Sequence, residues 1–226
     1  MTYILQIETS HPTCSVSISQ DGNTLHEVNG TEVNDHAGQL APMIATCADM
    51  CNIPLSALSA VAVSIGPGSY TGLRIGLSTA KGICYGLQLP LICISTLVSM
   101  AAGARQQMEG ASVDYLCPLI DARRMEVYTA LYDKNLQEVI APSALIVEAV
   151  PMRDSIDSNQ HLAFFGSGTD KLSSLLQGEK NTILTNYKVL SSYMSGLAID
   201  AYKAGNFADM AYTEPSYLKE FYTTGS

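Results

Sequence analysis

A glycine-rich corner that joins an apolar run to a helical pattern is the feature that most restricts how this chain can fold. Residues 61–65 carry only Val, Ala, Ser and Ile, which is typical of a short buried strand. The segment that follows at once is Gly66-Pro67-Gly68-Ser69-Tyr70-Thr71-Gly72, and a helical pattern then covers 71–87. Glycine and proline mark a sharp turn, so a strand is expected to lead directly into a helix. This order favours an α/β protein.

The rest of the chain gives two similar series of elements. The first half predicts an antiparallel meander and then alternating helices and strands: strands near 2–8, 13–19 and 24–29, a helix at 36–51, a strand at 61–65, a helix at 71–87, a strand at 90–95 and a helix that ends near 108. The second half repeats this order more loosely: strands at 115–120, 126–132, 136–140 and 162–165, and helices at 169–177 and 191–204. The repeat predicts an internal duplication, with one subdomain at 1–107 and another at 108–226 whose C-terminal tail could pack back on the first.

Composition excludes several classes of protein. Hydrophobic residues make up 47% of the 226 residues and charged residues 15%, which excludes a disordered chain or a coiled coil. Lysine and arginine number 12 against 21 acidic residues, and the resulting net charge of −9 disfavours direct, autonomous binding of nucleic acid. The six cysteines form no Cys-x-x-Cys pair and lie among apolar neighbours, as buried thiols in a reducing compartment do.

The sequence predicts neither a targeting segment nor a membrane span. The N-terminal segment has no basic cluster and contains the acidic residue Glu8, so no signal peptide is expected. Residues 82–104 carry no charge, but Pro90 interrupts them, so they are interpreted as a helix end, a buried strand and the next helix. We therefore expect a cytoplasmic protein that does not contact a membrane.

The glycine corner does not match a phosphate-binding motif. The glycines at 66, 68 and 72 miss the dinucleotide spacing by one residue, no Lys-Ser or Lys-Thr pair follows, and Pro67 lacks an N–H. A tight corner capped by Ser69 or Thr71 is the favoured interpretation, and a nucleotide-gripping loop is the alternative.

The helix predicted after the corner contains an unusual number of glycines. Gly72, Gly76, Gly82 and Gly86 lie within it, and each interior glycine costs a helix about 0.5–1 kcal/mol relative to alanine. Close approach of another backbone would offset this cost. That backbone could belong to the chain's own sheet, or to a helix of another subunit that packs against this helix and the apolar stripe of 36–51.

Residues 66–76, Gly-Pro-Gly-Ser-Tyr-Thr-Gly-Leu-Arg-Ile-Gly, resemble the signature of the bacterial TsaB (YeaZ) family. The resemblance extends to several other segments: Ile7-Glu8-Thr9-Ser10, Asn34-Asp35-His36, Leu40-Ala41-Pro42-Met43-Ile44, Ala80-Lys81-Gly82, Pro90-Leu91, Asp121-Ala122-Arg123-Arg124-Met125-Glu126-Val127-Tyr128 and Pro215-Ser216-Tyr217-Leu218. The region between about 140 and 210 carries no such match.

The resemblance implies a fold, a function and a set of partners. The fold would be two actin/Hsp70-like (ASKHA) subdomains, that is, duplicated ribonuclease-H-like units with mixed sheets. The function would be that of a non-catalytic platform subunit, which binds and activates the catalytic paralogue TsaD, together with the ATPase TsaE. The complex threonylcarbamoylates adenosine 37 of tRNAs that read codons beginning with A. The chain alone would form a homodimer and would reach tRNA only through the complex.

The resemblance also implies where the functional residues lie. The partner interface is expected on the helices at 36–51 and 71–87, at His36, Leu40, Met43, Cys47, Gly72, Leu73, Gly76, Ala80 and Ile83. The signature turn comprises Gly66, Pro67, Gly68, Ser69, Thr71 and Arg74. A cation so early in a helix opposes the helix dipole, so a carboxylate or phosphate partner for Arg74 is one interpretation and a solvated side chain the other.

Glu8, Asp121 and Arg123 form a candidate polar cleft, in which the two carboxylates could act as a general acid and base. A strand-end polar contact is the favoured interpretation of Glu8. No catalytic residue and no metal site is expected. At the positions of the paralogue's two metal-binding histidines this chain has Thr96 and Met100, and a hydroxyl and a thioether do not replace two imidazoles.

Two other functions compete with the platform subunit. One is an ATP-binding small-molecule kinase or hydrolase of the same fold superfamily, which would need a phosphate site at Glu8 and the 66–72 corner. The other is a metallopeptidase, which the missing histidines disfavour. Cys47, Cys51 and His36 could approach one another, but no fourth metal ligand is in sight. We expect the chain alone to bind no cofactor, with ATP entering only at the level of the complex.

Overall fold

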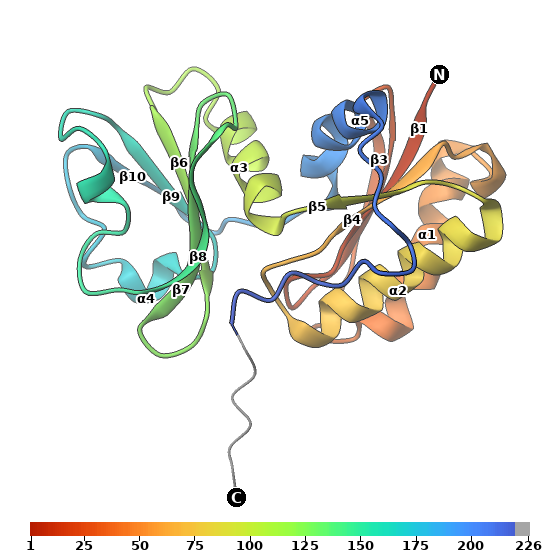
Figure 1. Cartoon of the computed structure of the whole chain (residues 1–226), viewed down its shortest axis with the longest axis horizontal. Helices are drawn as coiled ribbons and strands as arrows, with labels where there is room; N and C mark the ends of the chain where they lie inside the picture. The colour runs from red at the N-terminus through yellow and green to blue at the C-terminus, as the bar shows by residue number, and fades with distance from the viewer. Residues whose placement is uncertain (220–226) are drawn as a thin grey trace, which may run out of the picture. The chain divides into compact units, whose positions relative to one another are not determined.

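The computed structural model describes residues 1–219 and divides the chain into two compact units (Figure 1). The first unit comprises Met1–Gly103 and Val189–Pro215, and the second comprises Ala104–Lys188 and the described residues from Ser216 on. Residues 220–226, the end of the predicted second subdomain, lie outside the described residues.

The first unit is built on a five-stranded mixed sheet with the order β3-β2-β1-β4-β5. Its elements are β1 (Tyr3–Glu8), β2 (Ser15–Gln20), β3 (Asn23–Asn29), α1 (His36–Cys51), η1 (Leu55–Ala57), β4 (Ala60–Ser64), α2 (Tyr70–Leu87), β5 (Leu91–Ile94), η3 (Ser191–Met194) and α5 (Ser195–Ala204). The first three strands form the predicted antiparallel meander, and β4 and β5 continue the sheet in parallel with β1. Helix α3 (Thr96–Gln107) begins in this unit and ends in the second.

Alternation along the strands gives the sheet two apolar faces, and both are covered. Helices α1 and α2 cover one face, where the buried cluster includes Leu5, Ile7, Val61, Val63, Leu40, Met43, Cys47, Leu77 and Ala80. Helix α5 covers the other face, with Ile4, Ala60, Ala62, Ile92, Met194, Ala198 and Ile199. Figure 1 shows α5 on the opposite side of the sheet from α2.

The second unit repeats this topology with fewer helical residues. Its sheet has the order β10-β9-β6-β7-β8, which matches the first sheet when β6 is equated with β1 and the others follow in sequence. The elements are β6 (Tyr115–Asp121), β7 (Glu126–Asp133), β8 (Glu138–Ile146), η2 (Arg153–Ser155), β9 (Leu162–Phe165), α4 (Thr169–Leu172) and β10 (Asn181–Leu184). The predicted duplication and α/β class are confirmed. The helix expected at 169–177 is shorter, and the sequence interpretation missed β10.

The return of residues 189–215 to the first unit differs from the expected division at 107/108, which assigned 108–226 to the second subdomain. Hydrogen bonds explain this return. The Ser191 N–H donates to the Ser15 hydroxyl oxygen over 2.8 Å, and the Glu27 carboxylate accepts from the Ser191 hydroxyl at 2.9 Å and from the Ser192 N–H at 2.8 Å. Together with the apolar face of α5, these bonds hold the segment on the first sheet.

Within residues 1–219, no helix is long and apolar enough to cross a membrane.

Candidate functional site

The predicted corner between β4 and α2 is held by the chain's own residues. Ser69 caps α2, because its hydroxyl oxygen accepts from the Gly72 N–H at 3.2 Å. The Ser69 N–H in turn donates to the Ser10 carbonyl at 2.6 Å. A Cβ atom added to Gly68 would lie 2.5 Å from that same carbonyl oxygen. The corner therefore packs tightly against the loop after β1, as the favoured interpretation of a tight, capped corner predicts.

The glycines of α2 fall into two groups, and the first group packs against the same loop. A Cβ atom on Gly72 would lie 2.1 Å from the Thr9 carbonyl oxygen, and one on Gly76 would lie 2.2 Å from the Thr9 hydroxyl oxygen. Gly82 and Gly86, in contrast, have no atom within 4 Å of that position. The close contact that offsets the helix-propensity cost of Gly72 and Gly76 is therefore made within the chain, with Thr9, rather than by another subunit.

The residues predicted as the partner interface face the core instead of the surface. The buried members are His36, Leu40, Met43, Cys47, Gly72, Leu73, Gly76 and Ala80, and Ile83 is partly buried. The apolar stripe of each helix packs on the chain's own sheet, which is the ordinary role of such a stripe. The buried members of this set pack inside the chain and Ile83 is partly exposed, so an interface at these residues stays a prediction.

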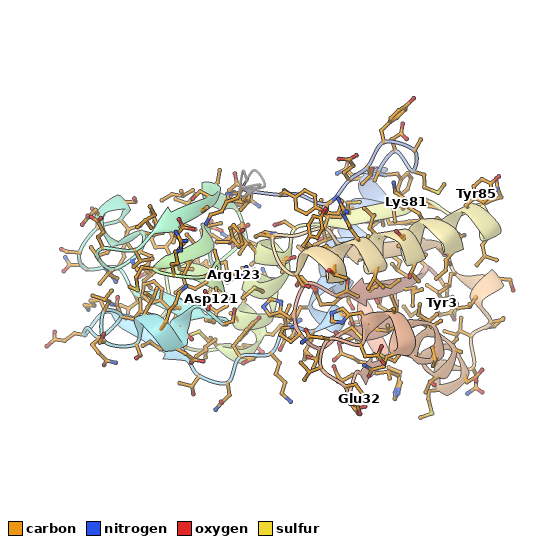
Figure 2. The ribbon with its side chains drawn as sticks, turned by 90° about the horizontal axis from the view of Figure 1, so that it is seen from below. Tyr3, Glu32, Lys81, Tyr85, Asp121 and Arg123 are labelled. Carbon is orange, nitrogen blue, oxygen red and sulfur yellow. The ribbon has the colours of Figure 1, made fainter. Side chains whose placement is uncertain are left out.

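The outward faces of α1 and α2 consist of other residues, most of them small. The exposed residues of α1 are Ala37, Gly38, Ala41, Pro42, Ala45, Thr46, Asp49 and Met50, and those of α2 are Tyr70, Thr71, Arg74, Ser78, Gly82, Tyr85, Gly86 and Leu87. We call this set the α1/α2 outer face. Met50 is 61% exposed and Tyr85 75% exposed, and Figure 2 shows Tyr85 on α2. The guanidinium of Arg74 lies 4.0 Å from the centroid of the Tyr70 ring, so a cation–π contact accounts for at least part of its environment.

Glu8 lies at the end of β1 and is fully buried. Its Oε1 accepts from the Ser10 N–H at 2.6 Å and from the Ser64 hydroxyl at 2.8 Å. Burial raises the pKa of this carboxyl, although the hydrogen bonds from Ser10 and Ser64 lower it. Glu8 therefore makes a polar contact between the ends of β1 and β4, and its carboxyl has no exposed surface at which to meet a substrate.

Asp121 and Arg123 belong to the second unit: Asp121 is the last residue of β6, and Arg123 lies in the turn that leads to β7. The Asp121 carboxylate accepts from the Arg123 N–H at 2.8 Å and from the Lys171 ammonium at 2.5 Å. Partial burial raises the pKa of Asp121, but the hydrogen bonds from Lys171 and Arg123 outweigh burial and lower it. Glu8 and Asp121 are thus held by separate hydrogen-bond networks, and their pairing in one cleft stays a prediction.

The part of the chain described by the structure contains no group of three or more His, Cys, Asp or Glu side chains that could hold a metal ion. Thr96 and Met100, which the resemblance aligns with the paralogue's histidines, are fully buried in the first turns of α3. The His36 imidazole contacts the His11 carbonyl at 2.7 Å. All six cysteines are free thiols.

Comparison with known proteins gives a consistent result. The family model described as "TsaD: tRNA N6-adenosine threonylcarbamoyltransferase" matches residues 30–219. The tRNA threonylcarbamoyladenosine biosynthesis protein TsaB of Bacillus subtilis is 31% identical over 168 residues, which are 74% of this chain and 71% of that protein. TsaB of Escherichia coli is 36% identical over 132 residues, which are 58% of this chain and 55% of that protein, so this match spans about half of its length.

Solved structures agree on the fold. YeaZ from Pseudomonas aeruginosa superposes with a TM-score of 0.83 at 27% identity, covering 96% of this chain and all of that one. A more distant likeness, to (R)-2-hydroxyglutaryl-CoA dehydratase component A of Acidaminococcus fermentans, has a TM-score of 0.56 at 10% identity and covers 91% of this chain and all of that one. It supports the fold alone, the predicted actin/Hsp70-like (ASKHA) architecture. From the family match, the curated relatives and the duplicated topology together, the chain belongs to the TsaB family.

Proposed function

We propose that the chain is a non-catalytic subunit in tRNA threonylcarbamoyladenosine biosynthesis, and that it acts by binding a TsaD-type catalytic partner. The names of its relatives support the pathway. The chemistry of the site supports the non-catalytic role. The carboxyl of Glu8 is sealed in the protein, and a threonine and a methionine stand where the catalytic paralogue has its histidine pair.

The observation that carries the proposal is the composition of the α1/α2 outer face. A helix that faces water on one side usually presents charged and polar residues there. Asp49 is the one charged residue on the exposed side of α1, where alanine, glycine, proline and threonine lie instead, and Met50 and Tyr85 add large apolar groups. Small side chains let a partner helix approach closely, so we propose this face as the surface for TsaD and, in the chain alone, for a second copy.

Substitution of Ala45 by arginine tests this surface. Ala45 is exposed on α1, so Ala45→Arg should leave the melting temperature unchanged and abolish co-purification with the TsaD-type protein of the same organism. Ala204→Arg is the matched control, because Ala204 is exposed on α5, at the opposite face of the sheet. The modification of tRNA by the reconstituted system should fail with the first variant and proceed with the second. Normal binding by Ala45→Arg would show that the outer face is not the interface.

We also propose that ATP and the TsaE ATPase join only when the complex is assembled in the cytoplasm. The corner contacts support this, because the Ser69 N–H already donates to the Ser10 carbonyl and is not free to bind a phosphate. Calorimetry with Mg-ATP should show no binding to the chain alone and binding to the assembled complex. Tight binding and turnover by the purified chain would favour the kinase or hydrolase instead.

A further inference from the structure

The turn between β6 and β7 places two consecutive arginines in a backbone conformation that L-residues rarely adopt. Arg123 has φ = 68° and Arg124 has φ = 48°. The connection is closed by the bonds from the Ala122 N–H to the Glu126 carbonyl and from the Glu126 N–H to the Arg123 carbonyl. Positive φ in such a loop is usually taken by glycine or asparagine, because a Cβ atom is unfavourable there. Solubility would be served equally well by charged residues on the flanking strands. Arginine at both positions therefore indicates that the side chains themselves are needed at the tip of the hairpin.

The surrounding residues hold this unfavourable turn in place. The Lys171 ammonium donates to the carbonyl oxygens of Arg124 at 2.9 Å and Glu126 at 2.6 Å, in addition to the Asp121 carboxylate. The Asp121 carboxylate also receives the Arg123 N–H. Because a lysine ammonium has three N–H groups, these contacts can engage all of them. The turn is therefore organised before any ligand arrives, which lowers the entropic cost of binding.

The same contacts leave the charges of the two arginines uncompensated. The carboxylates next to the turn are already paired, Asp121 with Lys171 and Glu126 with Lys219. Among residues 1–219, no ion pair involves either guanidinium, and both arginines are exposed (Figure 2 labels Arg123 beside Asp121). A chain with a net charge of −9 thus presents a local excess of positive charge at one preformed turn.

We propose that Arg123 and Arg124 contact the phosphodiester backbone of the RNA substrate. Guanidinium groups bind phosphate oxygens through two parallel N–H bonds, and contacts of this type position an RNA without reading its sequence. Two such contacts on an acidic protein give weak binding, which gains strength when a partner contributes further contacts. The inference rests on the proposed function in so far as the RNA is a tRNA.

The double variant Arg123→Asn with Arg124→Gly separates the role of the side chains from the role of the turn. Asn-Gly suits the turn better than Arg-Arg, so this variant should melt at a temperature equal to or above that of the wild type. Binding of a fluorescent tRNA transcript is measured over a range of salt concentrations, with the full chain alone and with its complex with TsaD. The slope of log K against log salt should become shallower by about 1.5 in the variant, for two lost phosphate contacts. Lys134→Asn with Lys188→Asn, which removes two exposed charges elsewhere, should leave the slope unchanged.

Several results would overturn this assignment. One is the absence of salt-dependent RNA binding by both the wild-type chain and the complex, and another is an equal loss of slope in the control variant. ATP or inorganic phosphate is added at the same concentration of phosphate groups as the RNA. Displacement of the RNA under this condition would assign the turn to a small phosphate ligand. If the double variant instead keeps the wild-type salt slope and fails to co-purify with TsaD, that result would assign the turn to a protein contact. Co-purification of the wild type tests the proposed function separately, because RNA binding by the chain alone does not depend on it.

Discussion

Two glycines in α2, six residues apart, are predicted to respond in opposite ways to the same substitution. A Cβ atom on Gly76 would lie 2.2 Å from the Thr9 hydroxyl oxygen and 3.2 Å from its methyl group, and the β-branched threonine cannot move away easily. We expect Gly76→Ala to lower the free energy of unfolding by about 1–3 kcal/mol. Urea denaturation measures this change.

Gly82→Ala is the matched control on the same helix. Nothing lies within 4 Å of its added Cβ atom, so the substitution should raise the free energy of unfolding by about 0.5–1 kcal/mol through the higher helix propensity of alanine. Equal effects of the two substitutions would contradict the close approach of α2 to Thr9.

The buried carboxyl of Glu8 should make stability depend on pH. Burial raises its pKa above the usual 4.5, so the folded chain binds its proton more tightly than the unfolded chain does. The contribution of Glu8 to the free energy of unfolding therefore declines as the pH rises above about 4.5. Glu8→Gln keeps an oxygen acceptor for Ser10 and Ser64 but does not ionise.

We expect the wild type to lose stability relative to Glu8→Gln as the pH rises above about 4.5, the usual pKa of this carboxyl. Chemical denaturation of both proteins at each pH measures the difference, and the contributions of other titrating groups cancel in the comparison. Parallel profiles would show that the carboxyl titrates in the folded chain as it does in the unfolded one.

At the scale of elements, helix α1 shows what the sequence could and could not predict. Its bounds, 36–51, were predicted correctly, because Asp35 caps the first turn and Asn52 ends the helix in the left-handed conformation. The apolar stripe of the helix was identified, but hydrophobicity alone did not show whether it packs on the chain's own sheet or on another subunit. Burial in the structure assigns Met43 to the core and Ala45 to the surface.

The second miss concerns a contact between segments far apart in the sequence. Glu27 and Ser191 are separated by 164 positions, and neither residue lies in a motif that would pair them.

Short strands with few buried residues are also hard to predict from the sequence. The strand β10 contains four residues, none of them fully buried, and lacks the alternation that marks a half-buried strand. The topology was predictable because the buried strands β4, β5 and β9 are each followed by an α-helix, whereas the docking of η3 and α5 was not.

The contact of Glu27 with η3 predicts a localised loss of protection. In Glu27→Ala the Ser192 N–H and the Ser191 hydroxyl lose their acceptor, so the free energy of unfolding should fall by about 1–3 kcal/mol. Hydrogen exchange should accelerate in η3 and α5 more than in α1. Glu32→Ala is the control, since it removes the same charge from an exposed loop and should change neither quantity. Uniform acceleration over the whole chain would contradict a local docking role.

At the scale of the whole molecule, the two units differ in how their sheets are covered. Helices α1, α2 and α5 cover the first sheet, with 16, 18 and 10 residues. The one α-helix that lies wholly in the second unit, within the described residues, is α4, with four residues. Both edge strands of the second sheet, β8 and β10, contain no fully buried residue. Less apolar burial gives less stabilisation, so the second unit should open first.

Buried free thiols can measure this difference, because Cys14, Cys47 and Cys84 lie in the core of the first unit and Cys117 lies in the core of the second. Burial raises the pKa of Cys84 in the first unit to about 11 and that of Cys117 in the second to about 12, and the thiolate is the reactive form. Both thiols should resist iodoacetamide in the native protein at about pH 8 and react as soon as their unit opens. We expect Cys117 to become reactive at a lower urea concentration than Cys84, as read by mass spectrometry of peptides after brief labelling. Simultaneous labelling of both would mean that the two units unfold as one cooperative structure, and earlier labelling of Cys84 would reverse the predicted order of stability.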